Sequence, residues 1–244
     1  MATFKLTIEY DGTAYAGWQQ QPDQPTVQAA IEAALARITG AHIPVIGAGR
    51  TDSGVHAIGQ VASFRTDRLM APSQWVKALN AILPSDISVR SADHTPDDFH
   101  ARYSARAKVY RYRILNRRER SALSKQRAWH VRKRLDVEAM REGAARLIGR
   151  HDFSSFQGSP TDTKDPICDL RRLKIVQRHA LITIEMEGDR FLKQMVRALV
   201  GTLVEVGLAK RPASSMKDIL EATDRRAAGY TAPPYGLYLD RVTY

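Results

Sequence analysis

Residues 47–57 combine the residue types that a chemical step requires. Asp52 supplies a carboxylate, Arg50 supplies a guanidinium two residues earlier, and three glycines stand around them. Glycines allow positive φ angles and let a backbone approach a ligand closely. A lone carboxylate on such a loop could serve as a nucleophile or a base. It could equally cap backbone N–H groups in a tight structural turn, and the local pattern leaves both interpretations open.

The elements around this loop indicate how it is held. Apolar residues of strand type precede and follow it, so it should connect two short strands. Upstream, a helical pattern begins after Thr26, a good N-cap, and ends at Gly40, a good C-terminal stop. Downstream, Ser73 is expected to cap a second helix that Pro84 ends. The expected order is strand, helix, strand, strand, helix, strand, at residues 4–10, 26–40, 45–46, 61–64, 73–84 and 87–91.

This order is that of a ferredoxin-like unit, and the second half of the chain repeats it with insertions. The repeat consists of an alternating strand, a helix capped by Asp136, a hairpin turning near His179, a strongly apolar helix and a last strand. These elements are expected at residues 108–114, 136–149, 173–187, 191–206 and 236–239. We therefore expect an α+β protein with two ferredoxin-like halves, residues 1–105 and 106–244. Together they should form a mixed, largely antiparallel sheet with a central cleft.

The composition narrows the class of protein. With 244 residues, 43% apolar and 26% charged, the chain can build a sizeable globular core. The single cysteine, Cys168, excludes an internal disulfide and a cysteine-rich metal cluster. No apolar run is long enough to span a membrane. Residues 1–8 lead directly into a strand pattern without the apolar core of a signal peptide, so we expect a cytoplasmic protein with no membrane partner.

The charge is unevenly distributed along the chain. The formal net charge is +11, yet residues 1–100 carry a net charge of −3 and residues 101–244 a net charge of +14. Residues 102–134 alone contain 13 basic residues and one acid, Glu119. A basic run can be a solvated face or a disordered tail. This one includes a clear strand pattern and several aromatic residues, which favours a folded surface that faces nucleic acid.

Six sequence blocks then resemble one known family. Residues 49–56, Gly-Arg-Thr-Asp-Ser-Gly-Val-His, resemble the catalytic motif of the tRNA pseudouridine synthase A family. The other five blocks occur in the order of that family and cover nearly the whole chain. They are residues 10–19, 99–112, 151–156, 191–201 and 232–239. One block would be a weak signal, but six in register, with the central motif intact among them, are a specific signal.

The resemblance implies a function and roles for four residues. Asp52 matches the catalytic nucleophile, Tyr110 matches the residue that stacks on the target uracil, and both Arg50 and Arg197 match substrate-binding arginines. In the family, Arg197 corresponds to the arginine that pairs with the catalytic carboxylate, and Arg50 to one linked to nucleotide extrusion. The resemblance also implies the pseudouridine synthase fold, a homodimer, no cofactor, and uridines 38, 39 and 40 of the tRNA anticodon arm as substrates.

The reaction suits these residue types. Converting uridine to pseudouridine breaks the bond between C1′ and N1, rotates the base and joins C5 to C1′. This isomerisation is redox-neutral, so it requires neither a metal nor a nicotinamide. A carboxylate could add to C1′, add to C6 of the uracil, or act as a base toward the ribose. The sequence leaves these three routes open, but each needs an ionised carboxylate, which a nearby cation such as Arg197 favours.

Several aromatic residues have two possible roles. Tyr110 and Tyr112 share one face of their strand, and we expect Tyr110 to stack on the base and Tyr112 to lie in the core. Trp18, beside three glutamines, could contact bases or pack beneath its own loop. The histidines are scattered without zinc-ligand spacing, so no metal site is expected.

Two other function classes compete with an isomerase. A non-catalytic tRNA-binding or tRNA-folding module could use the same basic surface, but it would not need the Asp52 loop, and the RRM aromatic signature is absent from the sequence. A glycosidase with paired carboxylates would need a second acid in the cleft, and none can be identified.

Overall fold

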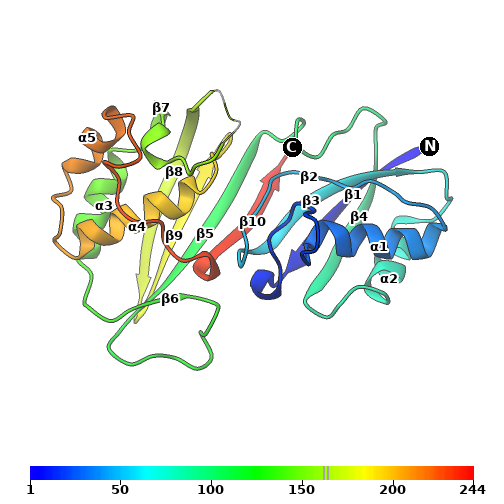
Figure 1. The fold of residues 1–244 in the computed structure, drawn as a ribbon, viewed down its shortest axis with the longest axis horizontal. Coiled ribbons are helices and arrows are strands. Elements are labelled where there is room, and N and C mark those ends of the chain that lie inside the picture. The colour runs from blue at the N-terminus through cyan, green and yellow to red at the C-terminus, as the bar shows by residue number, and fades with distance from the viewer. Residues whose placement is uncertain (162, 164) are drawn as a thin grey trace. The chain divides into compact units, whose positions relative to one another are not determined.

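The computed structural model describes residues 1–161, 163 and 165–244, and the chain forms two compact units (Figure 1). The first unit contains residues 1–106 and 238–244, and the second contains residues 107–237. The described residues form ten β-strands and five α-helices, which confirms the mixed α+β class. Within these residues, every helix lacks the length or the apolar character needed to cross a bilayer.

The first unit is built on a sheet whose central strands are antiparallel neighbours. Its strands are β1 (Ala2–Tyr10), β2 (Ile46–Gly47), β3 (His56–Thr66), β4 (Ile87–Thr95) and β10 (Leu237–Thr243). Strand β1 lies between β4 and β3 and pairs antiparallel with both. The far edge of β3 pairs antiparallel with β2 and parallel with β10. The predicted order of strand and helix is confirmed through β4.

Two helices cover this sheet, and one of them begins differently from the prediction. Helix α1 (Val27–Thr39) has the predicted caps: the Thr26 hydroxyl accepts a hydrogen bond from Ala29 N, and Gly40 adopts φ +78°. Helix α2 (Pro72–Asn80) starts one residue before Ser73, so the predicted Ser73 cap is wrong. Pro72 suits the first helical position because its φ is already helical. The Gln74 side chain accepts the N–H of Ala71, the actual N-cap, at 2.8 Å.

The second unit has a largely antiparallel sheet with helices packed beside it. Its strands are β5 (Ala107–Asn116), β6 (Trp129–Val131), β7 (Gly149–Asp152), β8 (Ile167–Arg178) and β9 (Leu181–Gly188). Strands β5, β9, β8 and β7 follow one another across the sheet, and β6 pairs with the end of β5. The helices are α3 (Val137–Ala145), α4 (Met195–Gly207) and α5 (Ser215–Glu221). Helix α3 packs on α4, α5 and β8 (Figure 1).

Each difference from the predicted bounds of an element has a structural cause. The hairpin turns at His179, as predicted, and His179 adopts φ +53° there. Strand β3 begins at His56 instead of residue 61 because its first residues pair with β1 and β10. Helix α4 begins at Met195 instead of residue 191 because Gln194 has a left-handed φ of +57° that a helix cannot include. The predicted helix over 136–149 ends at Ala145, and its last predicted residue starts β7.

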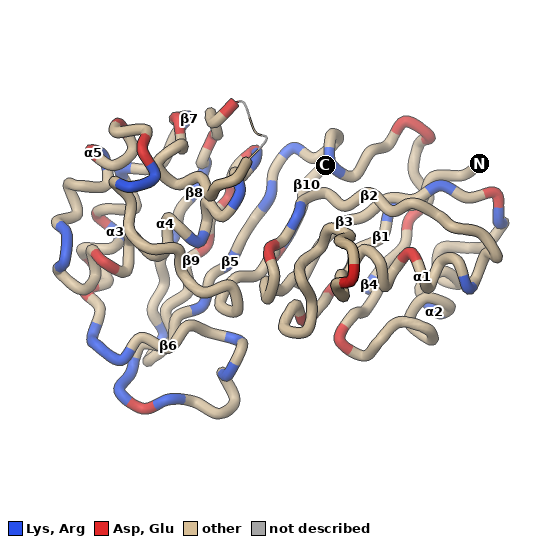
Figure 2. Tube along the Cα trace, in the orientation of Figure 1, with Lys and Arg blue, Asp and Glu red and all other residues tan. Residues whose placement is uncertain are grey.

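Lys and Arg residues are frequent in the second unit on the segment between β5 and β6 (Figure 2). Asn116, at the end of β5, closes this segment at its base. Its side-chain amide donates to the carbonyls of Val131 and Lys133 at 2.9 and 2.7 Å, and its carbonyl oxygen accepts Leu135 N at 3.1 Å. The basic segment is therefore a loop with a fixed base and exposed cations.

Candidate active site

The Asp52 loop lies between β2 and β3 of the first unit, where a second segment holds its backbone. This segment, residues 10–19, is called the strap below. Trp18 N donates to the carbonyl of Thr51 at 3.1 Å, and the N–H of Gly54 donates to the carbonyl of Tyr15 at 3.3 Å. Gly17 and Asp52 also form a β-bridge. The backbone on both sides of the carboxylate is thus fixed by hydrogen bonds from another part of the chain.

Two glycines of the strap make this close approach possible. A Cβ atom on Gly12 would lie 1.9 Å from the carbonyl oxygen of Val55. Gly17 adopts φ +111°, and a Cβ there would lie 2.5 Å from the carbonyl oxygen of Thr51. Any larger residue would therefore push the strap away from the loop. Both glycines stand in the sequence block at residues 10–19, but their partner in the fold was not evident from that block alone.

Aromatic side chains of the strap support the loop from within the core. The Tyr10 hydroxyl lies 2.7 Å from the hydroxyl of Thr51, and burial raises the pKa of Tyr10, so its phenol stays protonated. Trp18 is only 2% exposed, and its indole lies where a side chain on Gly47 would be. Of the two roles considered for Trp18, packing beneath the loop is therefore correct and base contact is wrong.

His56 fixes the other end of the loop. Its ring is buried, stacks on Tyr238 with centroids 4.8 Å apart, and places Nδ1 3.0 Å from an Asp11 carboxylate oxygen. The same nitrogen lies 3.1 Å from the backbone N of Gly12. Nδ1 can donate to Asp11 or accept from Gly12, but not both at once, and either bond ties His56 to the start of the strap. The sequence marked His56 as a motif residue without indicating this structural role.

The two predicted side chains of the loop differ in exposure. Asp52 is half-buried, and its carbonyl oxygen accepts Val55 N at 3.1 Å to close the turn. Arg50 is exposed, and its Nε donates to the side-chain oxygen of Gln19 at 3.0 Å. The strap therefore also orients Arg50. A fixed turn that carries one carboxylate and one oriented cation can present both groups to an anionic ligand.

The predicted aromatic pair lies on β5 in the second unit. Tyr112 is fully buried, its hydroxyl donates to the carbonyl of Pro233 at 2.7 Å, and burial raises its pKa. The prediction that Tyr112 belongs to the core is confirmed. Tyr110 is 7% exposed, and its ring packs edge-on against Phe191 at a centroid distance of 5.1 Å. Phe191 thus constrains the ring plane of Tyr110, which is buried in this structure.

Arg197 stands in the first turn of α4 and is bound twice to one residue. Its Nε donates to the carbonyl of Ala232 at 2.8 Å, and the N–H of Ala232 donates to the carbonyl of Arg197 at 3.0 Å. The chain segment that carries Ala232 runs directly against the helix. A Cβ on Gly201 would lie only 1.8 Å from the carbonyl oxygen of Tyr230. The space that Gly201 leaves is therefore filled by the backbone that orients Arg197.

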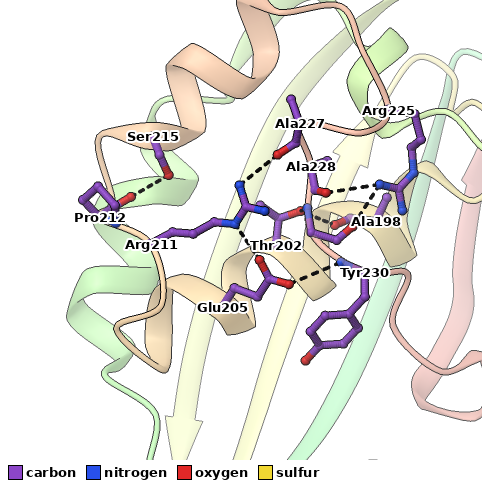
Figure 3. Close-up of polar contacts among 11 residues, drawn as sticks. Ala198, Thr202, Glu205, Arg211, Pro212, Ser215, Arg225, Ala227, Ala228 and Tyr230 are labelled. Carbon is purple, nitrogen blue, oxygen red and sulfur yellow. Dashed lines mark hydrogen bonds and ion pairs between the residues drawn. The ribbon is translucent and has the colours of Figure 1, made fainter.

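A polar network ties this segment, residues 224–232, to α4 (Figure 3). Glu205 accepts hydrogen bonds from Arg211 Nε at 2.6 Å and from Tyr230 N at 3.4 Å. The Thr202 hydroxyl accepts Gly229 N at 3.0 Å. Further bonds run from Arg211 to the carbonyl of Ala227, and from Arg225 to the carbonyl of Gly229 and the hydroxyl of Thr231. This network was not predicted, although Glu205, the one acid on a strongly apolar helix, was a signal for it.

The structure divides the four predicted site residues between the two units. Asp52 and Arg50 lie on one loop of the first unit, and Tyr110 and Arg197 lie in the second unit, on β5 and α4. Across the part of the chain that the structure describes, His, Cys, Asp and Glu side chains do not gather into a group of three that could hold a metal ion.

Comparison with known proteins gives a consistent result. A family model described as tRNA pseudouridine synthase matches residues 6–104 and 144–244. A tRNA pseudouridine synthase A from Myxococcus xanthus is 47% identical over 245 residues, which cover all of this chain and 92% of the relative. The protein of the same name from Acetivibrio thermocellus is 44% identical over the full length of both chains. The α+β architecture is that expected of the pseudouridine synthase fold, and the chain belongs to the tRNA pseudouridine synthase A family.

Proposed function

We propose that this protein isomerises uridine to pseudouridine at positions 38, 39 and 40 in the anticodon stem-loop of tRNAs. The observation that carries the proposal is the Asp52 loop, a fixed turn with one carboxylate and one oriented arginine inside the family's sequence motif. Relatives named tRNA pseudouridine synthase A match the whole chain and support tRNA as the substrate. The choice of positions 38–40 rests on the family resemblance.

The reaction is balanced within the substrate. The bond from C1′ to N1 breaks, the base rotates, C5 bonds to C1′, and the proton lost from C5 is matched by one gained at N1. Asp52 is the catalytic residue, and its carboxylate adds to C1′ or C6 or removes a ribose proton. A pre-formed turn favours each of these routes because the carboxylate need not be reordered when the substrate binds.

Three further residues bind the substrate in this proposal. The target uracil must leave its stack at a cost of a few kcal/mol. Stacking on Tyr110 would return about 1–3 kcal/mol of that cost. Arg50 contacts the backbone of the extruded nucleotide, and Arg197 supplies positive charge at the reacting nucleotide. Half-buried Arg197 suits this role because its hydrogen bonds with Ala232 hold the guanidinium in one orientation.

The two parts of the chain would have different roles. Residues 1–105 carry the catalytic loop, and residues 106–244 carry Tyr110 and the basic surface that meets the tRNA. The exposed cations between β5 and β6 support this assignment because phosphate contacts dominate nucleic-acid affinity. We further propose, from the family resemblance, that the protein is a cytoplasmic homodimer, which sedimentation of the purified protein would test.

Position-resolved mapping of pseudouridine tests the proposal. Unmodified tRNA transcripts with uridine at 38, 39 or 40 are incubated with the protein, and matched transcripts carry cytidine at the same position. Pseudouridine should form at these three positions only. Tight binding without any pseudouridine would instead favour a non-catalytic tRNA-binding or tRNA-folding module. Pseudouridine at other positions would keep the enzyme class and refute the site assignment.

A further inference from the structure

One exposed aromatic side chain of the first unit is unusually well supported. Tyr103 is 75% exposed, and it lies on the segment that follows β4, residues 96–106. Single exposed apolar residues are normal on protein surfaces. Tyr103 differs because its ring stacks on His100 with centroids 4.3 Å apart and planes 27° apart. The guanidinium carbon of Arg102 also lies 5.5 Å from the centre of the Tyr103 ring.

The imidazole beneath Tyr103 is fixed by the backbone. His100 Nδ1 accepts the N–H groups of Arg102 and Tyr103 at 3.2 and 3.1 Å, so this nitrogen carries no proton. His100 N donates to the Ser104 hydroxyl at 3.2 Å, and Ser104 N donates to the carbonyl of His100 at 2.9 Å. These four bonds close a tight turn. The two rings are therefore stacked by the turn itself, before any ligand is present.

The turn is anchored to the core of the first unit. Ala101 is fully buried, its N–H donates to the Ser63 hydroxyl at 3.2 Å, and its carbonyl accepts the Tyr244 hydroxyl at 2.7 Å. Burial raises the pKa of Tyr244, so that phenol stays protonated and remains a donor. Ala101 also belongs to the apolar cluster of Ala48, which lies two residues before Arg50. The turn is thus anchored to β3, the strand that follows the Asp52 loop.

We propose that His100, Arg102 and Tyr103 form a nucleobase-stacking site that receives an unpaired base of the bound RNA other than the target uridine. This inference rests on the proposed function only in taking RNA as the ligand. The Tyr103 ring lies on His100 and has the Arg102 guanidinium over it, so a base can stack on the guanidinium plane or take its place on the ring, close to the positive charge. This combination suits a base and its phosphate.

A nucleobase fits this surface better than a protein partner does. Stable protein interfaces bury about 800 Å² on each side around an apolar centre. Here a single aromatic side chain stands among exposed polar neighbours, including Arg102, Ser104 and Arg106. One ring of this size covers one base. A contact between two copies of the chain is the competing outcome, and the experiment below distinguishes it.

Affinity for one unmodified tRNA transcript tests the site in the full-length protein. Tyr103→Ala and Tyr103→Leu remove the aromatic face and should raise Kd by roughly 5- to 150-fold, the range for one stacked base. Tyr103→Phe keeps that face and should stay within about twofold of the wild type. Leu69→Ala is the matched control because Leu69 is 95% exposed in the same unit and should leave Kd unchanged.

Three further measurements separate stacking from other roles. The slope of log K against log[salt] should be the same for all Tyr103 variants because a tyrosine neutralises no phosphate. At saturating RNA, the single-turnover rate of Tyr103→Ala should equal that of the wild type within about twofold, since the residue does not touch the reacting base. A 2-aminopurine placed at each unpaired position in turn should be quenched by the wild type at one position, and this quenching should be lost in Tyr103→Leu.

Three results would overturn the stacking site. The first is that Tyr103→Ala binds tRNA as tightly as the wild type. The second is that Tyr103→Leu binds as tightly as Tyr103→Phe. The third is that Tyr103→Ala sediments with a different mass from the wild type. The last result would make this surface a contact between copies of the chain. If the wild type forms no pseudouridine but its RNA affinity still depends on Tyr103, the proposed function fails and the stacking site stands.

Discussion

The position of Asp52 is set by backbone hydrogen bonds of its neighbours, and these bonds do not involve the Asp52 side chain. The turn is fixed by Thr51, Gly54 and Val55, whose backbone groups bond to the strap or close the turn. The side chain of Asp52 can therefore change without removing these bonds. The same holds for Tyr110, because β5 and Phe191 set the position of its ring. Substitutions at these two residues should report on chemistry and substrate contact.

The hydroxyl and the ring of Tyr110 can be separated by substitution. Tyr110→Phe keeps the stacking face and the contact with Phe191, so tRNA affinity should stay close to that of the wild type. Tyr110→Ala should lose about 1–3 kcal/mol of binding and also lower the single-turnover rate. Filter binding and single-turnover pseudouridine formation measure the two effects. If Phe binds normally but reacts as slowly as Ala, the hydroxyl takes part in proton transfer at C5.

At the scale of elements, each unit holds its predicted site residues by the same construction. A loop or helix carries the functional side chain, and a segment distant in sequence lies against it through glycine contacts. In the first unit the strap reaches the Asp52 loop through Gly12 and Gly17. In the second unit residues 224–232 reach α4 at Gly201. These glycines are therefore needed for packing, and their substitution should disturb the functional side chains indirectly.

Gly201→Ala tests this construction on α4. The new methyl group would lie 1.8 Å from the carbonyl oxygen of Tyr230, so the segment must move and Arg197 must lose its bond to Ala232. Such overpacking should lower the free energy of unfolding by about 1–3 kcal/mol. Pseudouridine formation should fall more than tRNA binding does, which urea denaturation and single-turnover assays on the same protein would show.

Gly143→Ala in α3 is the matched control. Its methyl group would lie 3.0 Å from the Met216 side chain, and its nearest backbone carbonyl, that of Ala213, would be at an ordinary contact distance of 3.6 Å. The gain in helix propensity, about 1 kcal/mol, should offset the contact and leave both stability and activity near wild type. Equal losses in the two variants would mean that the clash at Tyr230 has no particular effect on Arg197.

Some elements could be predicted accurately from the sequence and others could not. Helix α1 with both caps and the hairpin at His179 could be predicted, because these depend on local signals in the chain. The early start of β3 could not be predicted because it depends on partners far away in sequence, and the late start of α4 could not be predicted because a glutamine gives no signal for the left-handed backbone at Gln194. Asp52 and Arg197 could be identified because they lie in sequence motifs. The strap and the Glu205 network could not be predicted, because both consist of contacts between residues far apart in the sequence.

At the scale of the whole molecule, the charge distribution predicts how RNA binding responds to salt. Arg118 and Arg120 are exposed on the loop between β5 and β6. Arg117 instead donates to carbonyls of Glu119 and Arg120 and so helps to shape that loop. Reversal of Arg118 and Arg120 to Glu should weaken tRNA binding and reduce the slope of log K against log[salt] by about 1–2.

The control for this reversal changes charge elsewhere by the same amount. Arg37→Glu with Lys77→Glu alters two exposed helical residues of the first unit and should leave the salt slope nearly unchanged. Identical losses in both double variants would show a general charge effect and would remove the loop from the RNA-binding surface.

A buried thiol and buried phenols predict that the protein loses stability at alkaline pH. Burial raises the pKa of the Cys168 thiol to about 12 and also raises those of Tyr10 and Tyr112. In the unfolded chain the thiol loses its proton near pH 9. The stability from these groups is therefore complete below pH 9 and is lost as pH rises toward 12. Urea midpoints should fall from pH 8 to pH 10, and DTNB should not modify native Cys168 at pH 8. Rapid modification of the native protein would contradict this burial.

The central claim is that Asp52 performs the reaction, and its replacement by Asn tests this most directly. Asn is nearly isosteric, and the strap holds the turn through backbone groups that remain. Single-turnover pseudouridine formation and filter binding are measured on one tRNA transcript with uridine at position 39. We expect affinity within about tenfold, or 1.4 kcal/mol, of the wild type. Turnover should fall to background, because residues 47–56 contain no second acid. Substantial turnover by the Asn variant would contradict the assignment, and a joint loss of binding and thermal stability would make Asp52 a structural turn residue.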